Sequence, residues 1–206
     1  MKKIPKTLIL RGVLRYNIRV NKLAKSFMSL PSAVSELLSS APAVGFSGSR
    51  SVVPAACAEV VPAVCSPVLV GCARGVDAAF RAAFPSARVF SAASFGSGRG
   101  SFAARSSAFV RALHLSGGVL VSFPSPGSFP SGLVPSPSSS RCFSGFGSGS
   151  WASLALAVGL GVPCAVFLPP GEPVPAGFSV PSVWCARSVG GGWWVCQPRA
   201  VQLSLF

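Results

Sequence analysis

Acidic residues and histidine are scarce in this sequence. Of its 206 residues only four are aspartate or glutamate, and His114 is the single histidine. A serine or cysteine nucleophile needs a neighbouring base and a group that orients that base. The many serines therefore have almost no partners for nucleophilic catalysis, and no pattern of metal ligands is present. The sequence predicts no catalytic residue, no metal site and no cofactor.

The seven cysteines lack the close spacing that is typical of metal sites and redox pairs. No two of them form a Cys-x-x-Cys pair, and their odd number argues against a closed disulfide framework. Unpaired cysteines behave in folded proteins as small buried hydrophobes. We therefore expect free thiols and a reducing compartment, the cytoplasm, as the location of the protein.

Lysine is absent after residue 25, and this divides the chain by charge. Eight of the 18 basic residues lie within the first 25 positions, and the formal net charge is +14. We expect residues 1–40 to form a basic N-terminal extension, for which three interpretations stay open. They are a basic amphipathic helix for a membrane surface or a polyanion, an organellar transit peptide, and a poorly ordered segment upstream of a true start near Met28. The apolar run 8–10 is too short for a secretory signal.

Long uncharged stretches are confined to one region, which raises the question of a membrane span. No charged residue lies between Arg141 and Glu172, and residues 151–168 are nearly all apolar. The turn Gly159–Pro163 interrupts this run in its middle. A helix, a glycine turn and a buried parallel strand account for both halves without a bilayer. We therefore expect no transmembrane segment.

Apolar segments of strand length alternate with segments of helical periodicity over residues 41–171. The expected strands are 43–47, 68–72, 87–90, 118–123 and 164–168, and the expected helices are about 54–64, 75–84, 102–115 and 151–160. This alternation predicts an α/β fold, a Rossmann-like open parallel sheet with helices on both faces. We expect the Ser- and Pro-rich segment 124–140 to be a loop, either functional or disordered. Residues 172–206 form a C-terminal appendage in which one edge strand is expected around Trp193.

Three glycine-containing turns lie where open α/β sheets bind ligands. They are Gly48–Arg50 after the first strand, Gly71–Asp77 after the second, and Gly147–Ser150 before the last helix. Backbone N–H groups at a helix N-terminus attract anions, and an arginine can hold two oxygens of a phosphate at once. Arg50 and Arg74 are the arginines that can take this role.

The polar residues of these turns also have structural interpretations. The hydroxyl groups of Ser49 and Ser150 can cap helices instead of binding a ligand. Arg74 can form an ion pair with Asp77, and Asp77 can either interact with the helix dipole or contact a ribose or a base. Arg105 is either a ligand contact or an ordinary exposed arginine. The sequence alone is compatible with both the structural and the ligand-binding roles.

The turns resemble the SLOG superfamily, and within it the DNA-processing protein A (DprA) family, over residues 43–171. That family has a G-x-R turn, a G-x-A-x-G-[IV]-D turn and an S-G-S-rich turn in the same order. Residues 102–106 are similar to its F-x-x-R-N motif, with Ser106 in place of the asparagine, and residues 80–81 stand where a histidine is common. In the related phosphoribohydrolases a glutamate occupies the position of Ser153.

The resemblance implies a ligand class better than a reaction. We predict binding of a nucleotide or a nucleotide-derived small molecule without catalysis, because the glutamate of the phosphoribohydrolases is missing. The alternative is DprA-like binding of single-stranded DNA in recombination or DNA uptake, with Phe46, Phe95 and Phe102 as stacking platforms. The sequence is also compatible with a homo-oligomer. The expected ligand-binding residues are Gly48, Ser49, Arg50, Gly71, Arg74, Gly75, Asp77, Arg105, Gly147, Gly149 and Ser150.

Overall fold

The computed structural model describes residues 30–145, 147–178 and 184–198. Most of the predicted basic extension, and with it all three interpretations of that extension, lies outside the described residues. The described chain begins with helix α2 (Ser32–Ser39), in which Val34, Leu37 and Leu38 are buried. These side chains belong to the same apolar cluster as the central strands. The last residues of the predicted extension 1–40 therefore contribute side chains to the hydrophobic core.

From β1 to β5 the strands are separated by helical segments, in the predicted order. The central part of the chain contains β1 (Val44–Gly48), α3 (Ala56–Val60), η1 (Val61–Ala63), β2 (Val68–Gly71), α4 (Val76–Ala83), β3 (Arg88–Phe90), η2 (Ala92–Phe95), α5 (Arg99–Leu115) and β4 (Val119–Phe123). After it come α6 (Ser139–Cys142), α7 (Gly149–Gly159), β5 (Cys164–Phe167), η3 (Ala176–Phe178), β6 (Trp184–Gly190) and β7 (Trp193–Pro198).

All seven strands lie in one sheet, in the order β3-β2-β1-β4-β5-β7-β6. The pairs from β3 to β5 are parallel, whereas β7 pairs antiparallel with both β5 and β6. The residues of β2 and β4 are all buried, as expected for strands that are covered on both sides. The prediction of an α/β, Rossmann-like open sheet is confirmed.

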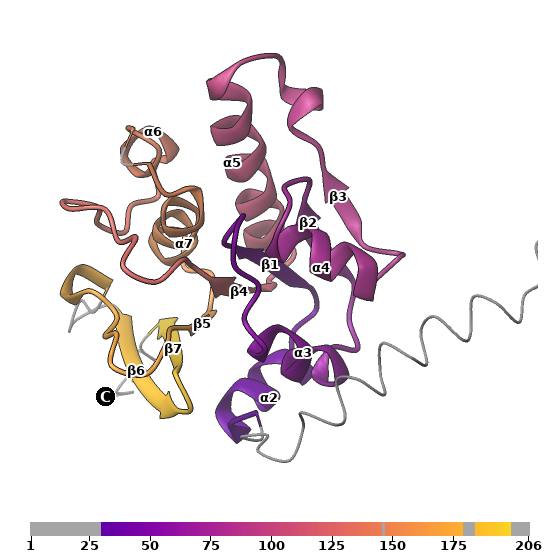
Figure 1. Ribbon diagram of the computed structural model, residues 1–206, viewed down its shortest axis with the longest axis vertical. Coiled ribbons are helices and arrows are strands. Elements are labelled where there is room, and N and C mark those ends of the chain that lie inside the picture. Colours follow the sequence, from indigo (N-terminus) through magenta and orange to yellow (C-terminus); the bar gives the residue numbers. More distant parts are fainter. Residues whose placement is uncertain (1–29, 146, 179–183, 199–206) are drawn as a thin grey trace, which may run out of the picture.

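Helices cover both faces of the sheet, as predicted (Figure 1). One apolar cluster joins α5 and α7 to the sheet, and a second joins α2, α3 and α4 to its other face. The alternation along β1 separates the two faces. Phe46 stacks on Phe80 of α4 with ring centroids 3.7 Å apart. A side chain at Gly45 would collide with Phe109 and Leu113 of α5, so glycine lets that helix approach the strand.

Several element boundaries differ from the prediction. Helix α5 begins at Arg99, three residues before the expected start at Phe102, because Gly98 has a φ of +86° that turns the chain directly into the helix. Helix α7 begins at Gly149 rather than at Trp151. The prediction of an edge strand around Trp193 was wrong, since β7 lies between β5 and the edge strand β6. Its Trp193 and Val195 are almost fully buried in the core.

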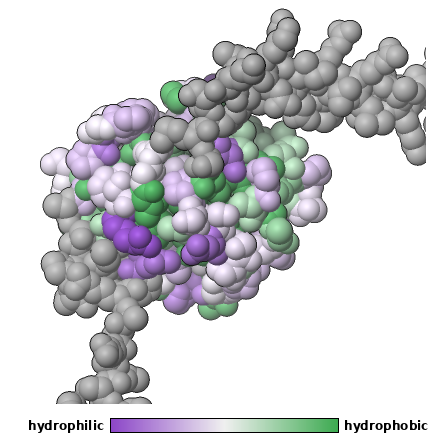
Figure 2. All heavy atoms as spheres, turned by 90° about the horizontal axis from the view of Figure 1, so that it is seen from below, coloured by the Kyte–Doolittle hydropathy of each residue, from purple (hydrophilic) through white to green (hydrophobic). Residues whose placement is uncertain are grey.

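The apolar run in the second half of the chain is divided between two elements. Helix α7 ends at Gly159, and Gly161 has a φ of +83°, which turns the chain back towards β5. Within the described ranges no helix is both long and apolar enough to cross a membrane. On the face seen in Figure 2, hydrophilic and hydrophobic residues are interspersed.

We predict that the close packing of the β1 turn against the β2 turn requires glycine at position 75. A Cβ atom at Gly75 would lie only 2.6 Å from the carbonyl carbon of Arg50, whereas one at Gly96 would meet nothing within 4 Å. Both glycines have positive φ angles, +71° and +98°. Replacing Gly96 with alanine should therefore cost about 1–3 kcal/mol of backbone strain. Gly75→Ala should lose roughly 1–3 kcal/mol more through overpacking.

Urea denaturation of the full-length variants measures both losses of unfolding free energy. Gly96→Ala is the matched control, because it has the same kind of backbone strain without the close contact. Equal losses for the two variants would contradict the packing of the two turns.

Candidate ligand-binding cleft

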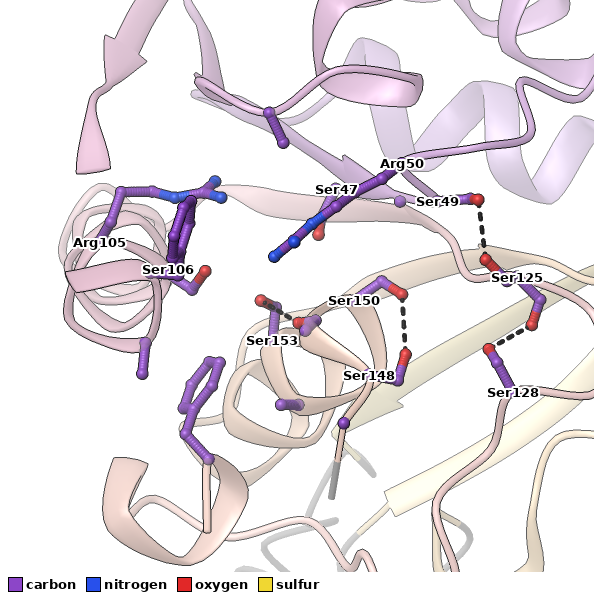
Figure 3. A pocket seen from close by; sticks show the side chains of 18 of the residues that line it. Ser47, Ser49, Arg50, Arg105, Ser106, Ser125, Ser128, Ser148, Ser150 and Ser153 are labelled. Carbon is purple, nitrogen blue, oxygen red and sulfur yellow. Dashed lines mark hydrogen bonds between the residues drawn. The ribbon is translucent and has the colours of Figure 1, made fainter. Parts of the chain in front are cut away.

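The topology of the sheet places a crevice beside the end of β1. The chain leaves β1 to form β2 on one side and later returns to form β4 on the other side. The connections diverge at this point, which is where open α/β sheets bind ligands. A cleft of about 920 Å³ lies there, lined by the β1 turn, the first half of α5, the loop after β4 and the first turn of α7 (Figure 3).

Ser49 fixes the turn that follows β1. Its hydroxyl oxygen accepts hydrogen bonds from the backbone N–H groups of Ser51 (3.2 Å) and Val52 (3.0 Å). The hydroxyl of Ser125, in the loop after β4, donates a further bond of 2.8 Å to the same oxygen. The side chain of Ser49 therefore closes the turn and ties it to the neighbouring strand end. It does not cap a helix.

The β1 turn presents Arg50 to the cleft. Figure 3 shows the Arg50 side chain extending between α5 and the first turn of α7, with its guanidinium group inside the cleft. The residue is exposed, and its guanidinium carbon lies 5.2 Å from the ring centroid of Phe102 on α5. An arginine held at this position can reach an anion at the α7 N-terminus on the opposite wall.

The first turn of α7 supplies the opposite wall of the cleft. Its first intrahelical hydrogen bond runs from the N–H of Ala152 to the carbonyl of Ser148, so the N–H groups of residues 149–151 have no acceptor within the helix. No side chain from the described part of the chain caps this end, and the Ser150 hydroxyl does not take the capping role considered for it. A Cβ at Gly149 would meet nothing within 4 Å, so the backbone there is open to a ligand.

A buried ion pair lies at the base of the cleft. Nη1 of Arg105 is 3.3 Å from Oδ2 of Asp77, and the two side chains are only 9% and 6% exposed. Burial raises the pKa of Asp77, while Arg105, the N–H of Ala73 and Arg81 offset part of that rise. The two charges hold α5 against the β2 turn. Nε of Arg105 is buried and has no hydrogen-bond partner among the described residues.

The ion pair overturns two of the structural interpretations of the sequence. Asp77 pairs with Arg105, 28 positions away, and not with the exposed Arg74. Arg105 is 8% exposed and is not an ordinary surface arginine. Gly71 lies against this pair so closely that a Cβ atom would overlap both Arg105 and Asp77. Because these contacts join residues that are far apart in the sequence, no local spacing rule could have revealed them.

Arg81 completes the fixation of the β2 turn. Its Nη1 donates hydrogen bonds to the carbonyl oxygens of Gly71 (2.6 Å) and Ala73 (2.9 Å). The N–H of Ala73 in turn donates to Asp77. The glycine turn after β2 is therefore filled and held by protein groups. Its role is to position α4 and the β1 turn, and it presents only Ala73 and Asp77 to the cleft.

The structure brings eight of the eleven predicted ligand-binding residues into the cleft wall. They are Gly48, Ser49, Arg50, Asp77, Arg105, Gly147, Gly149 and Ser150. Gly71, Arg74 and Gly75 do not line it. Phe143 and the loop residues Ser125 and Ser128 line it without having been predicted. The serine-rich composition of segment 124–140 was the only signal for Ser125 and Ser128, and it did not distinguish a functional loop from a disordered one.

The phenylalanines considered as stacking platforms differ in exposure. Phe46 is fully buried and belongs to the core, so it cannot stack on a base. Phe95 and Phe102 are 38% and 42% exposed, but only Phe102 lines the cleft. The cleft therefore offers one of the three predicted platforms, beside the cationic Arg50.

The cleft is poor in groups that carry out acid–base chemistry. Among the described residues of its wall Asp77 is the one carboxylate, and that carboxylate is already paired. Ser153 donates its hydroxyl proton to the carbonyl of Gly149 at 2.8 Å. Over the described ranges no three His, Cys, Asp or Glu residues come together as metal ligands. The arrangement is suited to holding an anion through N–H and guanidinium groups.

Comparison with protein-family models, with curated proteins and with solved structures finds no match. The resemblance to the SLOG superfamily therefore rests on the three turns quoted above and remains a prediction.

We predict that the Asp77–Arg105 pair is required as a pair. Asp77→Ala leaves a buried arginine uncompensated and should lower the unfolding free energy by about 3–5 kcal/mol. Arg105→Met in the same chain removes that charge and should recover a large part of the loss. Urea denaturation of the two single variants and the double variant measures the coupling. Additive losses would contradict the interaction.

Proposed function

We propose that the cleft binds a nucleotide or a nucleotide-derived small molecule through its phosphate group. The main support for this proposal is the position of Arg50, which lies across the cleft from the uncapped first turn of α7. The cleft lies beside the end of β1, where the chain connections to β2 and β4 diverge. The backbone N–H groups of residues 149–151 attract a phosphate, and Arg50 can hold two of its oxygens.

The charges around the cleft support an anionic ligand. Arg50 and Arg105 line the cleft, and Asp77 is the only acid among the described residues of its wall, so their side chains carry an excess of one positive charge. Nη1 of Arg105 forms the ion pair with Asp77, but the buried Nε of the same side chain has no hydrogen-bond partner among the described residues. An unpaired buried donor next to a cleft is satisfied when a ligand oxygen or a water molecule binds there.

We propose binding without hydrolysis. The phosphoribohydrolases that the chain resembles use a glutamate where this chain has Ser153, whose hydroxyl bonds back to its own helix. Asp77 cannot replace that glutamate while it compensates the charge of Arg105.

We propose that this SLOG-type domain binds its nucleotide in a reducing compartment such as the cytoplasm. The buried thiols of Cys57 and Cys142 form no disulfide.

Single-stranded DNA is the second candidate ligand. The net charge of +14 and the exposed rings of Phe95 and Phe102 favour it. Polynucleotide binding releases counterions from many phosphates, whereas a mononucleotide brings one phosphate group into a preformed cleft. The affinity of an oligonucleotide should therefore fall steeply between 50 and 200 mM salt, by about 10³-fold for six or more contacts. A mononucleotide complex should weaken far less.

We predict that Arg50 is required for binding and that Arg74 is not. Isothermal titration of the full-length protein with nucleoside monophosphates measures the affinities. Arg50→Gln removes a charge-assisted bond to the phosphate and should weaken binding by roughly 10- to 100-fold. Arg74→Gln removes an arginine of a neighbouring turn that is also exposed but does not line the cleft, and it should leave the affinity unchanged.

Equal effects of the two replacements would mean that general charge, and not the cleft, governs binding. Absence of any nucleotide binding by the wild-type protein would contradict the proposed function.

A further inference from the structure

Phe102 is an aromatic ring left at the cleft in a chain that buries most of its large apolar side chains. It belongs to the first turn of α5, is 42% exposed, and lines the same cleft as Arg50 and the first turn of α7. Phe109, two turns further along the same helix, is 2% exposed. The fold therefore does not need Phe102 in its core, and its ring is available at the cleft.

The guanidinium group of Arg50 covers this ring. Its carbon lies 5.2 Å from the ring centroid, a cation–π distance. Because the end of the Arg50 side chain lies inside the cleft (Figure 3), the face of the ring that it covers is the one that a ligand in the cleft would meet. The group expected to bind phosphate and the ring expected to bind a base are thus in contact with each other.

A planar base is a stronger partner for the ring than an exposed guanidinium group. Stacking of a base on an aromatic side chain strengthens binding by roughly 5- to 150-fold per base, whereas an exposed cation–π contact contributes less. A base that stacks on Phe102 takes the place of Arg50. The displaced guanidinium group would then be free to turn towards the N-terminus of α7, the position proposed above for the phosphate.

We propose that Phe102 is the stacking platform for the base, and that stacking releases Arg50 from the ring to bind the phosphate. This inference rests on the proposed function. It assigns the specificity of the cleft to ligands that carry an unsaturated ring and a phosphate in one molecule. A sugar phosphate without a base must displace Arg50 without gaining a stacking contact, and it binds more weakly for that reason.

The test compares adenosine 5′-monophosphate with ribose 5-phosphate by isothermal titration of the full-length protein. The wild-type protein should prefer the nucleotide by about tenfold or more. Phe102→Leu should weaken nucleotide binding about tenfold and leave ribose 5-phosphate binding no weaker, because Arg50 no longer has a ring to cover. Phe102→Tyr should retain the preference. Phe95→Leu is the matched control, since that ring is similarly exposed but does not line the cleft.

The outcomes separate this inference from the proposed function. Unchanged nucleotide affinity in Phe102→Leu would overturn the platform and leave the phosphate site intact. An equal loss for both ligands would overturn the exchange of Arg50 between ring and phosphate. If the wild-type protein binds neither ligand, both proposals fail. An oligothymidylate that binds and is weakened by Phe102→Leu but not by Phe95→Leu supports the platform and identifies a nucleic acid strand as the source of its base.

Discussion

Val76 donates its backbone N–H to the carbonyl oxygen of Ser49 at 3.0 Å, and this bond joins the first residue of α4 to the turn that carries Arg50. The contact is possible because Gly75 has no side chain to collide with the backbone of that turn. A Cβ atom at Gly48 would lie 2.8 Å from the side chain of Val76, so this position also needs glycine. Ser49 donates its own N–H to the carbonyl oxygen of Phe123 at the end of β4. Three strand ends are thereby locked together, and the direction in which Arg50 leaves the sheet follows from this packing.

The fold was accessible from the sequence because it follows from local patterns. The β-branched runs of β2 and β4 and the glycine turns that end them are contiguous in the chain, as is the turn at Gly161 that separates α7 from β5. The antiparallel β7 was misplaced because the burial of Trp193 depends on contacts with distant elements. Likewise, Asp77 looked like a partner for the nearby Arg74, whereas its actual partner Arg105 comes from another helix.

The candidate site was only partly accessible for the same reason. The glycine turns and Arg50 could be found because motifs mark them, but the sequence does not say which turn faces a ligand and which one is filled by protein groups. The β2 turn is filled: Arg81 and Asp77 satisfy its backbone. With Arg105 committed to Asp77, Arg50 is the arginine on the described cleft wall that has no ion pair, and the proposed phosphate site depends on it.

The proposed function requires that a phosphate binds at the first turn of α7, opposite Arg50. Titration of the ¹⁵N-labelled full-length protein with a nucleoside monophosphate, followed by the backbone amide resonances in two-dimensional NMR spectra, tests this most directly. We expect the largest shifts at the N–H groups of Gly149, Ser150 and Trp151, which have no acceptor within the helix. Shifts confined to the basic N-terminal residues, with these three amides unmoved, would contradict it.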